Sequence, residues 1–156
     1  MGRIEERLQE LGITLPSPAA PVANYVPYVN HNGLVTISGQ LCLGIDGKLL
    51  PEHVGTVGAA VSPETAKAGA RLCAINLLAQ LRAAIGDLDR VERCVRLGGF
   101  IASTPDFTGH APIMNGASDL MVEVLGDAGR HARSTIGVAA LPLGACVEVE
   151  GLFAVE

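Results

Sequence analysis

The stretch HARSTIGVAALPLGACVEVEGLFAV, residues 131–155, decides the fold because it predicts two β-strands. Val, Ile and Thr are dense on both sides of residues 142–144, Pro-Leu-Gly, the composition of a hairpin with a short loop. Side chains alternate between the two faces of a strand, so Arg133 and Thr135 share one face. Glu148 and Glu150 share a face of the second strand, opposite its valines. Charged residues are seldom buried in strands unless they are paired or functional.

Arg133 and Glu148 each have two interpretations. Arg133 could grip a substrate carboxylate with two parallel hydrogen bonds, or it could form a structural ion pair with a Glu. Glu148 could be a general base that positions water, or it could form a salt bridge or lie exposed at an edge. Glu150 is the more structural of the two glutamates. If the hairpin turns near residues 143–144, Glu148 lies opposite Ala139, roughly 20 Å along the strand from Arg133. One small ligand could not contact both, so either two subunits share a site or the two residues serve different purposes.

The remaining chain predicts a helix over residues 4–11, strands over 25–30 and 34–39, a helix over 63–85, a strand over 91–103 and a helix over 113–125. After the short N-terminal helix, the order is β-β-α-β-α-β-β. This order favours one α+β domain over residues 1–156, in which residues 1–22 form the helix and an extended connector. Two helices can cover only one face of a single mixed sheet. We expect the other face to be apolar and covered by further copies of the chain.

The composition of the chain argues against some classes of function. Charged residues are 17% of the chain and the net charge is −5, which argues against a nucleic-acid surface. We expect a cytoplasmic protein, because neither a membrane span nor a signal peptide is evident. The four cysteines are far apart in sequence and predict free, buried thiols. We expect no metal and no cofactor, and we expect solvent-exposed histidines at residues 31, 53, 110 and 131.

Residues 133–142, followed by Val-Glu-Val-Glu at 147–150, resemble the signature of the Rid superfamily. These reactive-intermediate deaminases are also called the YjgF family and were historically named endoribonuclease L-PSP. Ile-Ser-Gly-Gln at residues 37–40 and Gly-Asp-Leu-Asp-Arg-Val at 86–91 add to the resemblance, which covers the chain from about residue 20 to its end. The resemblance implies a chorismate-mutase-like fold, a homotrimer, and ligand clefts between subunits.

The resemblance also implies a chemistry: hydrolysis of enamines and imines, such as 2-aminoacrylate, to 2-keto acids and ammonia. Arg133 would hold the substrate carboxylate, and Glu148 would position or activate water. The pocket would be lined by the residues at the remaining matched positions, which are Tyr25, Ser38, Gly39 and Thr135. Thr135 stands where the family often has Cys, and Pro105 stands where its best-known members have Asn.

Three functions therefore compete. The first is an enamine/imine deaminase, a hydrolase. The second is a non-catalytic, trimeric binding protein for small carboxylates. The third is an endoribonuclease, which we rank last because the chain is acidic and holds only three Phe and two Tyr for base stacking.

Overall fold

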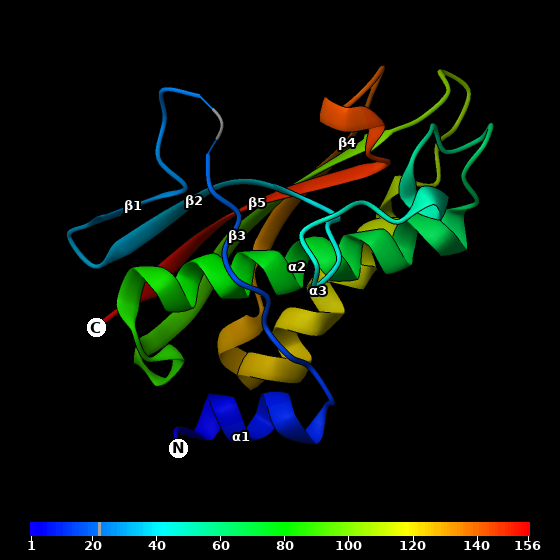
Figure 1. Cartoon of the computed structure of the whole chain (residues 1–156). Coiled ribbons are helices and arrows are strands. Elements are labelled where there is room, and N and C mark those ends of the chain that lie inside the picture. The colour runs from blue at the N-terminus through cyan, green and yellow to red at the C-terminus, as the bar shows by residue number, and fades with distance from the viewer. Residues whose placement is uncertain (22) are drawn as a thin grey trace.

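A computed structural model describes residues 1–21 and 23–156, and these form one mixed sheet with helices on one side (Figure 1). The strand order is β1-β2-β5-β3-β4. The strands are β1 (Tyr28–His31), β2 (Leu34–Leu41), β3 (Val91–Ala102), β4 (Ala132–Val138) and β5 (Val147–Val155). The helices are α1 (Arg3–Glu10), α2 (Pro63–Ile85) and α3 (His110–Leu125). Both α2 and α3 lie on the same face of the sheet, so the predicted α+β architecture is confirmed.

Local chemistry sets the ends of these elements. The Ser62 hydroxyl accepts the backbone N–H of Thr65 at 3.2 Å and caps α2, which ends at Gly86 as expected. Asn32 and Gly33 both have positive φ, 52° and 76°, which is the turn that joins two twisted antiparallel strands. Helix α3 begins at His110, earlier than the sequence predicted. Pro112 is tolerated there because a first-turn N–H has no intrahelical acceptor.

The predicted closing hairpin is wrong. β4 pairs in parallel with β3, whereas β5 pairs antiparallel with both β2 and β3. Helix α3 is the crossover that brings β4 back beside β3 in the same direction, as a parallel neighbour requires. The segment after β4 then passes the end of β3, where the Ala102 N–H donates to the Cys146 carbonyl at 3.0 Å. Strand composition identified both strands but could not identify their neighbours.

The core lies between the sheet and the two long helices. Phe153, Leu97 and Val149 on the sheet and Leu77 on α2 are fully buried there. Helix α1 forms an outer layer against α3 (Figure 1), and its connector is tied to α2 by a hydrogen bond from Gln80 Nε2 to the Ala19 carbonyl at 2.9 Å. The predicted N-terminal helix is thus confirmed; Val22, the last residue of the predicted connector, lies outside the described residues.

The face of the sheet away from α2 and α3, here called the open face, is not simply apolar as expected. Its exposed apolar side chains include Val29, Leu34 and Ile136. A hollow of about 200 Å³ on the same face is lined by Arg96 and Glu150 as well as by Leu152. The open face therefore mixes charge with apolar surface. Within the described part of the chain, the helices are too short or too polar to cross a membrane.

Candidate functional site

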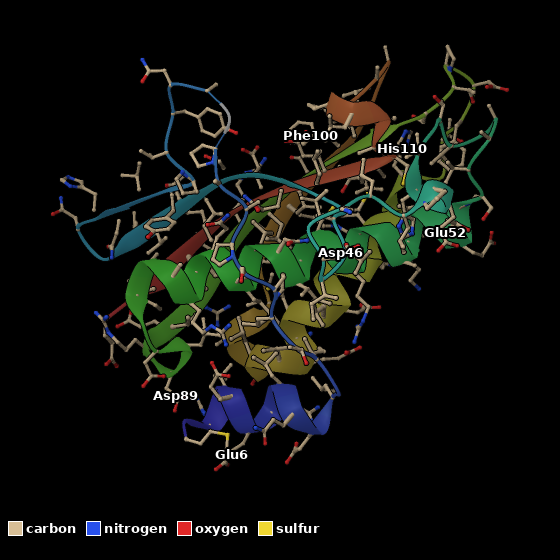
Figure 2. The ribbon with its side chains drawn as sticks, in the orientation of Figure 1. Glu6, Asp46, Glu52, Asp89, Phe100 and His110 are labelled. Carbon is tan, nitrogen blue, oxygen red and sulfur yellow. The ribbon has the colours of Figure 1, made fainter. Side chains whose placement is uncertain are left out.

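Arg133 and Glu148 lie on opposite faces of the sheet. Arg133 pairs with Leu97, which is buried against the helices, so its side chain starts on the helix-covered face. Glu148 pairs with Phe100, and both alternate with residues buried under the helices, so they lie on the open face. Figure 2 labels Phe100 on this face. Because Phe100 also pairs with Ile136, Arg133 and Glu148 are two strands and three residues apart, about 14 Å between Cα atoms. The predicted hairpin spacing is thereby corrected, and the sheet itself separates the two side chains.

Arg133 is held against α3 at the open edge of the sheet. Its Nη1 donates to the Ser118 hydroxyl at 3.0 Å, and its Nη2 donates to the Ala111 carbonyl at 3.2 Å. The residue is half-buried, and no carboxylate lies within ion-pair distance of it among the described residues. A guanidinium has five N–H donors, so three remain for a ligand. Among the described residues, the structural ion pair that competed with carboxylate binding is therefore not formed.

Thr135 follows Arg133 on the same face of β4. Its residue is half-buried, and its buried hydroxyl makes no hydrogen bond within the described residues. A buried hydroxyl without a partner carries a desolvation cost that a ligand or a further chain could relieve. Arg133 and Thr135 thus form one group of predicted site residues, both at the edge strand β4.

Glu148 forms the second group together with Gly39. An ideal Cβ built on Gly39 would overlap the Glu148 carboxylate, so only glycine leaves room for this side chain. Burial, and then the nearby Glu150 charge, raise the pKa of the Glu148 carboxyl above its usual value. A carboxyl with a raised pKa takes up a proton more readily at neutral pH, as a general base must.

Ser38 precedes Gly39 on β2, and its hydroxyl bonds to the segment that holds Tyr25. The Ser38 hydroxyl donates to the Val26 carbonyl at 2.8 Å and so fixes the segment before β1. Tyr25 is 52% exposed in the single chain. The structure thus places Ser38 beside Gly39 by chain connectivity and leaves Tyr25 at the surface next to Val26.

A cavity of about 370 Å³ lies beyond Thr135, at the end of β4. Ser103, Phe107, His110 and Gly137 help to line it. Ser103 Oγ and His110 Nε2 are 3.1 Å apart, and the His110 ring meets Phe107 edge-on. Both polar atoms stand 2.6 Å from the position of a Cβ on Gly137, so a larger residue there would displace the pair.

The expectation of four solvent-exposed histidines is wrong for three of them. His53 is buried, and His110 and His131 are half-buried and hydrogen-bonded to serines; His31 alone is exposed. Sequence reasoning missed Ser103, His110, Ser118 and His131, because their partners come from different elements. Cys42, Cys73, Cys94 and Cys146 are free and buried, as predicted. Among the described residues, no group of three or more His, Cys, Asp or Glu side chains could hold a metal ion.

This fold and this signature have known relatives. Residues 5–155 match the family described as "YjgF/chorismate_mutase-like, putative endoribonuclease". The chain therefore belongs to the YjgF/chorismate-mutase-like family, and the predicted membership and fold are confirmed.

Individual relatives cover nearly the whole chain. Protein TCP17 of Trypanosoma cruzi is 47% identical over 152 residues, which are 97% of this chain and 93% of TCP17. A protein of unknown function from Agrobacterium tumefaciens is 44% identical with a TM-score of 0.89, covering 98% of this chain and 94% of its own. A "putative endoribonuclease" from Shewanella oneidensis is 34% identical with a TM-score of 0.93, covering 99% of this chain and 100% of its own. RidA from an Antarctic Psychrobacter is 29% identical with a TM-score of 0.60, covering 91% of this chain and 96% of its own.

Proposed function

We propose that the protein is a deaminase that hydrolyses enamine and imine intermediates of amino acids to 2-keto acids and ammonia. Its active site lies in a cleft that two subunits of a homotrimer share. One observation carries it: Arg133 and Glu148 lie on opposite faces of the sheet in one chain. A small ligand can therefore contact both only if they come from different chains. Arg133 at the sheet edge and Glu148 on the open face are both available to a second copy.

Each residue has a defined task in this reaction. Arg133 holds the substrate carboxylate through its free N–H donors and thereby fixes the adjacent carbon–nitrogen double bond. Glu148 of the partner subunit orients a water molecule against that carbon and accepts one of its protons as the carbon–oxygen bond forms. That proton then returns to the nitrogen, which gives a carbinolamine. The carbinolamine hydroxyl passes its proton to the nitrogen as the carbon–nitrogen bond breaks, so both protons of the water leave in ammonia and its oxygen becomes the keto oxygen. The products are the 2-keto acid and ammonia, and the balance needs one water and no oxidant.

A non-catalytic carboxylate-binding trimer is the second candidate. It is favoured by two changes in the pocket wall, Thr135 in place of the frequent Cys and Pro105 in place of Asn. Both changes leave Arg133 and its free donors in place, so they affect turnover more than binding. The endoribonuclease named for the family and for the Shewanella relative is disfavoured by the net charge of −5.

Subunit mixing tests the proposed shared cleft. Arg133→Ala and Glu148→Gln chains would be purified separately, mixed under exchange conditions, and assayed for 2-keto acid release from imines made in situ by an amino-acid oxidase. Glu148→Gln alone should lose about 10²- to 10⁴-fold in rate, and Arg133→Ala alone should lose rate because it binds the substrate carboxylate about 10- to 100-fold more weakly. In the mixture, about one quarter of the clefts should combine the intact Arg133 of one chain with the intact Glu148 of the other. A mixture as inactive as the single variants would contradict the shared cleft.

A matched control uses the double variant Arg133→Ala/Glu148→Gln mixed with wild-type chains. If one chain holds the whole site, activity should equal the wild-type fraction, about one half. If two chains share it, activity should fall to about one quarter. A wild-type protein that binds 2-keto acids but releases none from any imine would favour the binding protein instead.

A further inference from the structure

The contacts of Arg133 continue into a hydrogen-bond chain of three side chains. His131 Nδ1 lies 2.6 Å from the Gly129 carbonyl, and His131 Nε2 lies 2.8 Å from Ser118 Oγ. Ser118 Oγ in turn lies 3.0 Å from Arg133 Nη1. Ser118 belongs to α3, whereas His131 and Arg133 flank the start of β4. The chain therefore joins the helix layer to the edge strand next to the proposed carboxylate site.

For a neutral imidazole, the direction of every hydrogen bond in this chain follows from the contact with the Gly129 carbonyl. A carbonyl can only accept, so His131 Nδ1 carries the proton that donates to Gly129. The other nitrogen of a neutral imidazole is then an acceptor, and the Ser118 hydroxyl must donate to it. With its proton committed to His131, the Ser118 oxygen presents a lone pair to Arg133, which has only donors. His131 thus decides what Ser118 offers to the guanidinium.

We infer that Ser118 and His131 are positioning residues that hold Arg133 ready for a carboxylate. This inference rests on the proposed function of Arg133. Ser118 and Ala111 lie about two helical turns apart on α3, and each accepts from a different terminal nitrogen of Arg133. The guanidinium is therefore fixed at two points, and the second N–H of each terminal nitrogen stays free. Fixing the fork before the ligand arrives lowers the entropy lost on binding.

Without His131, the Ser118 hydroxyl has another acceptor close by. A serine inside a helix can donate to the carbonyl four residues earlier, here that of Met114. Its oxygen would then turn away from β4, and Arg133 would lose one of its two fixed points. The prediction is specific to the Nε2 end of the ring, since Nδ1 contacts only Gly129 within this hydrogen-bond chain.

Two matched variants of His131 separate the two ends of the ring. His131→Gln places an amide near Nε2 and keeps an acceptor for Ser118, whereas His131→Asn places one near Nδ1 and keeps only the contact to Gly129. We would measure the dissociation constant for 2-oxobutyrate by titration calorimetry on the full chain. Ser118→Ala and His131→Asn should each weaken binding about 3- to 10-fold, and His131→Gln should bind nearly as wild type. In an Arg133→Ala background, Ser118→Ala should cause no further loss.

Several outcomes would overturn the inference. One is wild-type affinity in Ser118→Ala and His131→Asn while Arg133→Ala loses the ligand. Another is an equal loss of ligand affinity in His131→Gln and His131→Asn together with a lowered melting temperature. Ser118 and His131 would then only stabilise the packing of α3 on β4. If Arg133→Ala itself binds normally, the proposed function fails, and ¹⁵N NMR decides the inference. The His131 ring should show the Nδ1–H tautomer, and the Arg133 Nε–H signal should lose order in Ser118→Ala.

Discussion

The side chain of Glu148 on β5 lies where a side chain of residue 39 on β2 would otherwise be, and residue 39 is a glycine. The Glu148 carboxylate overlaps the position that a Cβ on Gly39 would take. The two residues meet near a register irregularity in β2, between its pairs with Gly151 and Val149. The Glu148 side chain can adopt this position only because residue 39 is a glycine. Its carboxylate then lies along the open face of the sheet.

Gly39→Ala should therefore slow catalysis strongly while the protein still binds carboxylates through Arg133. The added methyl must push the Glu148 carboxylate aside, and a shift of about 1 Å at a catalytic group costs on the order of 100-fold in rate. Gly98→Ala is the matched control, because its Cβ would stand 2.8 Å from the carboxylate of Glu150, the glutamate that we consider structural. Equal loss of 2-keto acid release in both variants would remove the distinction between the two glutamates.

How much of this site was predictable depends on the distance along the chain between the residues that meet. The Ser62 cap and the Asn32–Gly33 turn are encoded by neighbouring residues, and both were predicted correctly. The pairing of β4 with β3 depends on the path of α3 between them, which strand composition does not contain. Ser118 contacts His131 only after that crossover has formed. The sequence could therefore propose Arg133 and Glu148 as candidate site residues, but it could not predict the faces of the sheet on which they lie.

Glu148→Gln should stabilise the fold at neutral pH. Burial and the Glu150 charge raise the pKa of the Glu148 carboxyl above its usual 4.5, so the unfolded chain ionises first as pH rises. Ionisation of Glu148 therefore favours unfolding, and the penalty is complete only above the raised pKa. We expect the melting temperature of Glu148→Gln to exceed that of wild type at pH 7 to 8, and the difference to vanish below the usual pKa. A difference that is constant with pH would indicate a packing effect instead.

Asp89 should hold α1 on the rest of the molecule. Its carboxylate accepts the backbone N–H groups of Ile4 and Arg3, both at 2.8 Å, beside the first turn of α1 (Figure 2). These two hydrogen bonds, that of Ile4 first, lower the pKa of Asp89, so its contribution is present above the usual 3.8 and is lost as pH falls through the lowered value. Asp89→Ala should speed amide hydrogen exchange in α1 and leave the sheet unchanged.

Asp127→Ala is the control for this prediction. Its ion pair with Arg130 at 3.3 Å is exposed on both sides, and such pairs contribute little to stability. Hydrogen-exchange mass spectrometry should therefore show wild-type protection of α1 in Asp127→Ala. Unchanged exchange of α1 in Asp89→Ala would show that its buried residues, Ile4 and Leu8, hold the helix without the cap.

Arg133→Ala should strongly weaken carboxylate binding and leave the fold intact. Hydrogen bonds to a charged group contribute about 1.5–3 kcal/mol, so the affinity for a 2-keto acid should fall about 10- to 100-fold. The cost to stability should be small, because Ser118 keeps its hydrogen bond to His131 when the guanidinium is removed.

Arg133→Lys is the informative companion: it keeps the positive charge, but a single ammonium cannot reach Ser118 and Ala111 and also present a fork to the ligand. Titration calorimetry should show weakened binding in both variants, with melting temperatures close to wild type. If Arg133→Lys binds the 2-keto acid with wild-type affinity, the positive charge alone is enough to hold the ligand. If Arg133→Ala has a much lower melting temperature or fails to assemble, Arg133 is a structural residue of the β4 edge.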